Sequence, residues 1–448
     1  MSLPDFAVPL LRIFQPAFTQ PPYNRFLVLL LGALLTTGRC TITNLLRTAR
    51  LQGSGHMSSY HRVFSHRQWS SWRLARALMT FLLTHMVPTG PVFLAGDDTV
   101  AEHPGPKVFG KGRHRDGVRS THSYTAYRWG HKWVVLSVLI TLPGATRPWA
   151  LPVLVALYCS PEWHPTHRRR HKTPAHLARL LLARLIRWFP ERQFMFVGDT
   201  GYGTSETARF CSKYRRHLTL VSKFYGDAAL YELPPPRPRA TRGRPRVTGK
   251  QRPSPQEVVA KTAQRTQLIV AWYGGAHRAI EVVTGTGSWY RMGEALVAVR
   301  WVYVHDCTGT HRDAYFFTTH ITMRPQQLVE CYPQRWSMET TFQECREYLH
   351  LESTKGYCQR TVLRCTPCLF GLYTLVVLLY VQLPASARMR GAVVWQGKST
   401  VTFSDMMTCV RRAIWQLWLL PTPEDRQGFA TLSRSLQDTI LYALAPAA

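Results

Sequence analysis

The sequence predicts an α/β protein in which helices flank a mixed sheet, with a β-rich insertion and helical regions at both ends. Strand-like apolar runs alternate with amphipathic helical patterns between residues 91 and 220. Strand-like segments separated by turn residues follow between residues 265 and 320, and apolar helical patterns return after residue 361. Alternating strands and helices are typical of a sheet covered by helices, whereas strands joined by turns favour antiparallel hairpins.

Residues 1–88 are predicted to form a helical N-terminal domain that binds DNA. The apolar run 26–35 and the amphipathic stretch 60–86 both have helical patterns. Short helices broken by Gly and Thr, with Arg on their exposed faces, are compatible with a helix-turn-helix DNA reader. A plain helical cap on the following domain explains the same pattern equally well, so both interpretations stay open.

Residues 89–225 are predicted to hold the first part of the central α/β domain. The strand-like runs PVFLAGDDTV and RQFMFVGDT both end at acids, Asp97 with Asp98 in the first and Asp199 in the second. HKTPAHLARLLLARLIRWF is an amphipathic helix with a proline near its start, where helices tolerate proline. Acids at strand ends that precede turns lie where open sheets commonly place a functional site.

The rest of the chain is predicted to divide into three segments. Residues 226–322 form the β-rich insertion, which contains a proline-rich basic loop over 232–256. Residues 323–370 return to the central domain with a helix that bears Glu339, and residues 371–448 form a helical C-terminal region.

The charge balance indicates a polyanionic partner. Lys and Arg number 56 against 25 Asp and Glu, which gives a formal net charge of +31. The positive charge is spread over the whole length, as a long DNA-binding track requires. A basic protein that binds nucleic acid nonspecifically is the alternative interpretation.

Two basic segments are candidates for DNA contact. The loop 105–119 follows the first acids closely, and we expect it to contact phosphate through Lys111, Arg113 and Arg115. In the proline-rich loop, Arg242-Gly243-Arg244-Pro245 resembles the core of an AT-hook, whose Arg-Gly-Arg fits a narrow minor groove. A solvated surface loop is the alternative for each segment.

The run YPQRWSMETTFQECREYLH carries the most informative pattern in the chain. On a helix with about 100° per residue, Tyr332, Arg335, Glu339 and Arg346 fall on one narrow face. Guanidinium groups pair bidentately with phosphate, whereas a carboxylate needs a cation in order to approach phosphate. A carboxylate between two guanidiniums and a phenol therefore indicates a metal-bound phosphodiester site.

Asp98, Asp199 and Glu339 are the predicted catalytic residues and metal ligands. Mg²⁺ prefers hard oxygen ligands and keeps several waters, so three carboxylates suffice for two ions about 3.5–4 Å apart. Mn²⁺ is a possible substitute. Each acid taken singly has a structural interpretation, such as capping a turn or pairing along its helix. Their conjunction in so basic a chain favours a metal-dependent nuclease.

Together these residues resemble the insertion-sequence transposases that carry an Asp-Asp-Glu triad on a ribonuclease-H-like fold. The match is to the class with a Tyr-x2-Arg-x3-Glu-x6-Lys signature and a β-strand insertion before the Glu. Here the signature reads Tyr332, Arg335 and Glu339, with Arg346 at the Lys position. In that class the first acid commonly precedes Thr, which favours Asp98 over Asp97. Strand alternation leaves that choice open, because both faces of the run are apolar.

The resemblance covers roughly residues 90–370 and implies a DNA transposase that cuts at element ends and joins them to a target. It implies a homodimer on DNA and DNA contacts from Tyr332, Arg335 and Arg346. Some members stack a flipped base on an aromatic ring of the insertion; Trp289 and Trp301 are available, although core packing is favoured for both. A nuclease that cuts without rejoining, and a domesticated DNA-binding protein, are the alternatives.

The 10 cysteines are scattered, which fits a reducing cytoplasm, in association with the nucleoid if the host is bacterial. Cys365 and Cys368 form a lone CxxC in an apolar run, where buried thiols are favoured over a zinc site. The longest apolar runs, 26–35 and 368–384, are shorter than about 20 residues and are predicted to be buried helices rather than membrane spans.

Overall fold

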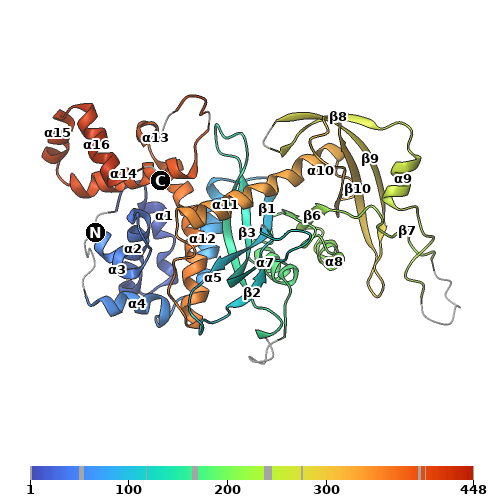
Figure 1. The fold of residues 1–448 in the computed structure, drawn as a ribbon, viewed down its shortest axis with the longest axis horizontal. Helices are drawn as coiled ribbons and strands as arrows, with labels where there is room; N and C mark the ends of the chain where they lie inside the picture. Colours follow the sequence, from blue (N-terminus) through green and yellow to red (C-terminus); the bar gives the residue numbers. More distant parts are fainter. Residues whose placement is uncertain are drawn as a thin grey trace.

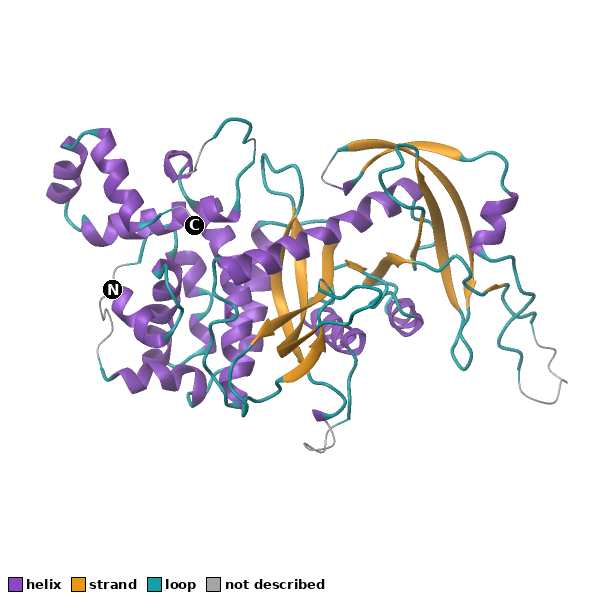
Figure 2. Ribbon diagram, in the orientation of Figure 1, coloured by secondary structure: helices purple, strands orange, loops and turns teal. Residues whose placement is uncertain are grey.

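The computed structural model describes residues 3–49, 55–117, 119–163, 170–236, 245–273, 276–391, 395–398 and 400–446. The molecule is elongated, with the N-terminal and C-terminal helices at one end and the strands β8 to β10 at the other (Figure 1). The other strands of the sheet lie between these two ends, as the colouring by secondary structure shows (Figure 2).

An 11-stranded mixed sheet runs through the molecule in the order β2-β3-β1-β5-β6-β11-β10-β9-β7, with β4 paired to β3 and β8 to β9. In chain order the strands are β1 (Val92–Glu102), β2 (Gly112–Arg115), β3 (Tyr127–Ile140), β4 (Trp149–Tyr158), β5 (Phe194–Gly198), β6 (Leu218–Lys223), β7 (Leu230–Tyr231), β8 (Thr266–Ala271), β9 (His277–Trp289), β10 (Val297–Asp306) and β11 (Ala314–Thr318).

The first part of this sheet has the ribonuclease-H-like order, which confirms the predicted fold class. Strands β1, β3 and β4 form an antiparallel meander. Strand β5 then pairs in parallel with β1, and β6 in parallel with β5. The helices α7 (Pro174–Trp188) and α8 (Ser205–Lys213) make the connections that parallel strands need.

The strands of the predicted β-rich insertion extend the same sheet. Strand β11 pairs antiparallel with β6, and β10, β9 and β8 follow outward from it, with α9 (Pro255–Lys261) beside them. Trp289 and Trp301 are 8% and 2% exposed, so the expectation that both rings pack in the core is confirmed.

The N-terminal helices pack directly on the central domain. They are α1 (Val8–Arg12), α2 (Gln20–Leu35), α3 (Ile42–Thr48), α4 (Met57–Ser65) and α5 (Ser71–His85), with a short 3-10 turn, η1 (Gln15–Ala17). Helix α5 contacts β4, and one hydrophobic core runs through these helices and the sheet. This packing is compatible with a helical cap on the central domain and does not test the predicted binding of DNA by these helices.

The C-terminal half contains α10 (Pro325–Cys331), the 3-10 turn η3 (Tyr332–Trp336), α11 (Ser337–Glu347), α12 (Gln359–Gln382), α13 (Ala385–Gly391), α14 (Phe403–Leu419), α15 (Pro423–Thr431) and α16 (Arg434–Leu444). The predicted domain boundary at residue 370 is wrong, because it falls inside the continuous helix α12. Helix α12 begins earlier than its apolar run and has 24 residues, so by length and composition it could cross a membrane. It packs against β4 and α14, and 61% of its apolar window is buried, as in a core helix.

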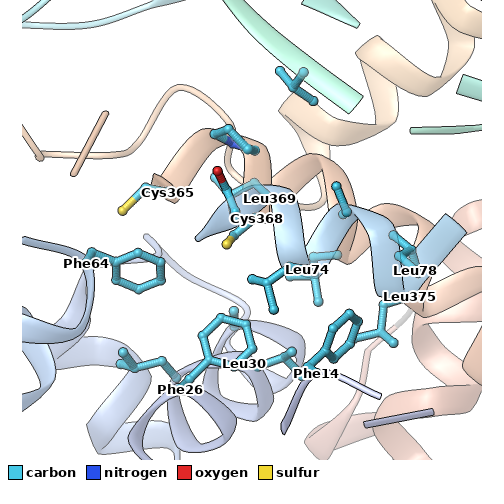
Figure 3. A pocket seen from close by; sticks show the side chains of 18 of the residues that line it. Phe14, Phe26, Leu30, Phe64, Leu74, Leu78, Cys365, Cys368, Leu369 and Leu375 are labelled. Carbon is cyan, nitrogen blue, oxygen red and sulfur yellow. The ribbon is translucent and has the colours of Figure 1, made fainter. Parts of the chain in front are cut away.

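An apolar cavity of about 170 Å³ lies between α12 and the N-terminal helices (Figure 3). Phe26, Leu74 and Leu375 line it, and so do both thiols of the CxxC, Cys365 and Cys368. Burial raises the pKa of Cys368 to about 12 and that of Cys365 further. Both cysteines are therefore protonated thiols of a core helix, as the sequence predicts.

A buried hydrogen bond fixes α11 to α12. The hydroxyl of Tyr373 donates to Glu344 Oε2 at 2.6 Å, and the Tyr373 ring stacks on Phe403 with centroids 4.2 Å apart. Burial raises the pKa of Glu344 to about 7, although the Tyr373 hydroxyl and Arg147 oppose the shift.

This raised pKa should make stability depend on pH. An acid whose pKa is higher in the folded than in the unfolded protein stabilises the fold at low pH, and its contribution is lost as pH rises through about 7. Glu344→Gln keeps an acceptor oxygen for Tyr373 and removes the ionisation. Relative to the parent protein, the variant should gain about 2 kcal/mol in unfolding free energy between about pH 5 and about pH 8, measured by urea denaturation.

The matched control is Glu347→Gln, which removes an exposed carboxylate from the same helix. It should show no such gain, because water already solvates that carboxylate. An equal gain in both variants would mean that net charge, and not burial of Glu344, causes the pH dependence.

Candidate active site

Asp97 and Asp98 project to opposite faces of β1, because side chains alternate along a strand. The face of Asp97 also carries Phe93, which packs with the cluster that contains Tyr332 of η3. The face of Asp98 is turned toward Tyr202, at the start of the connection to α8. The two adjacent acids therefore have separate surroundings.

Arg335 of η3 bridges two carboxylates. One of its terminal nitrogens donates to Asp97 Oδ2, and the other lies 3.3 Å from Glu339 Oε1. Asp97 and Arg335 are mostly buried, with 17% and 14% of their side chains exposed, whereas Glu339 is 51% exposed. The arginine therefore closes the buried side of the acidic group, and Glu339 faces the solvent.

Asp199 joins this group through the register of two parallel strands. Gly96 of β1 pairs with Gly198 of β5, so the next residues, Asp97 and Asp199, lie side by side on strands about 4.8 Å apart. Two hydrogen bonds hold the turn at Asp199: the Tyr202 amide donates to Oδ1 at 3.2 Å, and the Ser222 hydroxyl donates to the backbone carbonyl at 2.9 Å.

The carboxylates of this group outnumber its single guanidinium, that of Arg335. Burial raises the pKa of Asp97 to about 7, and the carboxylates of Asp199 and Asp98 add to the shift. Arg335 and the backbone N–H of Asp98 oppose it without cancelling it. A further cation here would be stabilised by the same electrostatic field.

Asp98 is held by two donors on the other face. Lys132 Nζ lies 2.8 Å from Oδ1, and the Tyr202 hydroxyl donates to Oδ2 at 3.0 Å. Burial, and then the charge of Asp98, raise the pKa of Tyr202 well above its usual value, so Tyr202 stays protonated. A Cβ on Gly198 would lie 2.6 Å from the Cβ of Tyr202, so the glycine permits this approach.

The prediction that Asp98, and not Asp97, belongs to the triad disagrees with this geometry. The preference for Asp98 came from the neighbouring Thr99, which does not determine the side of the strand that meets η3. The structure brings Asp97, Asp199 and Glu339 around Arg335, and Asp98 pairs with Lys132 instead.

The four-residue pattern on one helix is only partly observed. Tyr332 and Arg335 lie in the 3-10 turn, which contains Pro333, and Glu339 and Arg346 lie in α11. Proline lacks the N–H that a continuous helix needs. Tyr332 is 3% exposed and packs on Phe316, so its predicted contact with DNA is wrong.

Arg346 lies further along the face of β1 that carries Asp97. It donates to Thr99 Oγ1, and its Nε lies 3.6 Å from Glu352 Oε1. About a third of the side chain is exposed. Arg335 and Arg346 thus contact alternate residues of the same strand, Asp97 and Thr99.

The predicted basic loop is partly a strand. Residues 112–115 form β2, which pairs with β3, and Lys111 Nζ donates to the Gly105 carbonyl at 2.8 Å. Arg113 and Arg115 are exposed on this strand. Arg242 and Arg244 lie outside the residues that the structure describes.

The acids fit a divalent cation by their chemistry. Asp97, Asp199 and Glu339 supply hard oxygen ligands, and the guanidinium of Arg335 is the positive charge that they now share. Within the described part of the chain, no three His, Cys, Asp or Glu side chains are grouped closely enough to hold an ion. An ion would therefore need these carboxylates to come closer together, with Arg335 displaced from between them.

Sequence reasoning named Asp97 but preferred Asp98, and it missed Lys132 and Tyr202. Two signals could have indicated the partners of Asp98. Tyr202 follows Asp199 by three residues, and an antiparallel pairing of the two apolar runs would place Lys132 opposite Val100, two residues beyond Asp98.

Comparison with known proteins gives a family. A family model described as DDE superfamily endonuclease matches residues 14–279, more than half of the chain. A cryo-EM structure of a piggyBac transposase synaptic complex with hairpin DNA is similar over 96% of this chain and 77% of that chain, with 12% identity and a TM-score of 0.40. No curated protein matches the chain. The matched segment includes Asp97, Asp98 and Asp199 and ends before Glu339.

Proposed function

Because this chain belongs to the DDE superfamily endonucleases, we propose that it is a DNA transposase of the insertion-sequence type, which cleaves element ends and joins them to target DNA. One observation carries the proposal: Arg335 lies between Asp97 and Glu339, with Asp199 beside Asp97. A phosphate-binding group and a set of carboxylates at one point are what phosphodiester chemistry requires.

Asp97, Asp199 and Glu339 would hold the metal, with Asp97 in place of the predicted Asp98. Two Mg²⁺ ions, or Mn²⁺, would stabilise the attacking and leaving oxygens of the phosphodiester when bound. The two strand ends and the helix that carry these carboxylates pack in one hydrophobic core, which would support the site.

Arg335 has two competing partners in this proposal. Without DNA its guanidinium pairs with Asp97 and Glu339. A DNA phosphate offers the same planar group a bidentate partner of higher charge. Capture of Arg335 by phosphate would free the carboxylates, so that metal binding and DNA binding support each other.

The charge of the chain supports DNA as the substrate. The net charge is +31, and Arg346 lies along β1 beside the acids, at the Lys position of the proposed Tyr-Arg-Glu-Lys signature. Cutting and joining at two element ends favours a homodimer on DNA. A nuclease that uses only water as the nucleophile is the second candidate, because both reactions need the same acids.

The first prediction concerns Asp199. Asp199→Asn is nearly isosteric but removes a ligand charge, so cleavage of end DNA should fall at least about a hundredfold. DNA affinity in a mobility-shift assay should stay nearly unchanged, since it depends on many spread Lys and Arg residues. Undiminished cleavage by the variant would remove Asp199 from the site.

The two acids of β1 should respond differently. Asp97→Asn should abolish cleavage, although the amide can still accept from the Asp98 N–H. Asp98→Asn should retain cleavage but lower the unfolding free energy, because it weakens the ion pair with Lys132. Cleavage assays and urea denaturation on both variants measure this, and the reverse result would restore Asp98 as the ligand.

Replacing Arg335 with Lys should separate two roles for the guanidinium. If it positions a phosphate, Arg335→Lys loses the planar fork and cleavage should fall about tenfold or more, with little change in DNA affinity. If it is only a charge partner of Asp97 and Glu339, lysine should suffice. Full cleavage by the variant would leave Arg335 with a structural role alone.

A further inference from the structure

The hairpin of β2 and β3 carries exposed aromatic and basic side chains that the acidic site does not use. Tyr127 and Trp129 of β3 are 50% and 60% exposed. Arg113 pairs with Trp129 across the two strands, and Arg115 pairs with Tyr127. We call these four residues the stacking platform. In Figure 1, β2 lies toward the bottom of the molecule, at the edge of the sheet.

The platform is an ordered surface. Paired residues of antiparallel strands project to the same side, so all four side chains share one face of the hairpin. The guanidinium carbon of Arg113 lies 3.9 Å from the centre of the Tyr127 ring. On the other face, His114 is buried, which anchors the hairpin to the domain.

The charge of the platform is positive. The nearest acids on the hairpin and on β1 are turned to the opposite face, where Arg128 engages them. Its Nε lies 2.6 Å from Glu102 Oε1 and 3.6 Å from Asp116 Oδ2. The exposed rings are thus accompanied by the exposed arginines Arg113 and Arg115, and we infer attraction for an anionic partner.

The platform also lies on the same side of the sheet as the acidic site. Side chains alternate along β3, so Trp129 shares a face with Val135, which pairs with Asp97. Val135 is six positions along the strand from Trp129, a distance of about 20 Å. The side chains between them on this face, His131 and Trp133, are 3% and 0% exposed. A nucleic acid strand that joins the platform to the acidic site would therefore run over the elements that cover this face, past the partly exposed Arg346.

We propose that the stacking platform binds unpaired bases of the DNA strand that leads to the acidic site. Rings with a free face stack on bases of any sequence, and arginines between them pair with the phosphates. Duplex DNA keeps its bases stacked on each other and can use only the arginines. The platform therefore distinguishes opened from paired DNA. The inference rests on the proposed function, because it takes DNA as the substrate.

The test compares single-stranded and duplex DNA on the same variants of the full chain. Fluorescence anisotropy of a labelled oligothymidylate and of a labelled duplex of equal length gives the two affinities. Trp129→Ala should weaken single-strand binding about tenfold and change duplex binding less than about twofold. Tyr127→Ala should act in the same direction, and Trp129→Phe should restore most of the affinity, because it retains a stacking ring.

Tyr442→Ala is the matched control, since Tyr442 is 57% exposed on α16, away from the sheet, and should change neither affinity. Equal single-strand affinity in Trp129→Ala and the parent protein would overturn the proposal, and so would an equal loss for both DNAs. Loss of a dimer of the free protein in sedimentation, with unchanged DNA binding, would show instead that the platform contacts a second copy.

Failure of the proposed function gives a different result. In that case the parent protein shows no cleavage that depends on Asp199, whichever DNA it binds. If cleavage depends on Asp199 but Trp129→Ala leaves single-strand affinity unchanged, only the stacking inference is wrong.

Discussion

The ion pairs of Arg335 are the interaction on which the acidic site depends. They connect η3 to β1 and α11, and so join segments that are more than 200 residues apart in the chain. Removing one partner of a buried ion pair typically costs about 3–5 kcal/mol, because the other charge remains uncompensated. The pKa of Asp97 is raised to about 7 even with Arg335 present, and Arg335 is the largest of the influences that lower it. The arginine is therefore the main interaction that stabilises the ionised Asp97 carboxylate. Any cation or phosphate that enters the site must compete with these contacts.

Because side chains alternate along β1, the two adjacent acids have different partners. Asp97 faces η3 and lies beside Asp199, whereas Asp98 faces Tyr202 and Lys132. The Lys132 and Tyr202 contacts hold β1 against β3 and against the turn after β5. The strand ends that carry Asp97 and Asp199 are thereby fixed from the reverse face, and metal binding would need the side chains around Arg335 to rearrange.

The helices at both ends of the chain support the helix that bears Glu339. Helix α11 is tied to α12 by Tyr373, and α12 packs with α14 and with the N-terminal helices in one core. The N-terminal and C-terminal helices, which the sequence analysis assigns to separate regions, thus pack together in one core beside the sheet. The insertion strands lengthen the sheet on its other side and leave the β2–β3 edge open, where the exposed rings lie.

The sequence by itself determined the alternation of strands and helices, the basic character of the chain, and the candidate acids at two strand ends. These are local properties: apolar periodicity, charge and the position of acids after apolar runs. They sufficed for a mixed sheet flanked by helices and for Asp199 and Glu339 as candidates, which the structure brings to Arg335, whereas the ribonuclease-H-like fold was implied by the family resemblance. The β2–β3 hairpin was not foreseen, because a four-residue strand rich in Arg and His has no apolar pattern.

Only the tertiary structure showed that Asp97 lies beside Arg335 and that Asp98 pairs with Lys132, because both faces of β1 are covered and the sequence does not show which one meets η3. It also decided that Tyr332 is buried, that α12 is continuous through residue 370, and that the insertion extends the central sheet. The physical reason is the same in each case. Which face of an element is covered depends on residues far away in the chain, and local patterns do not carry that information.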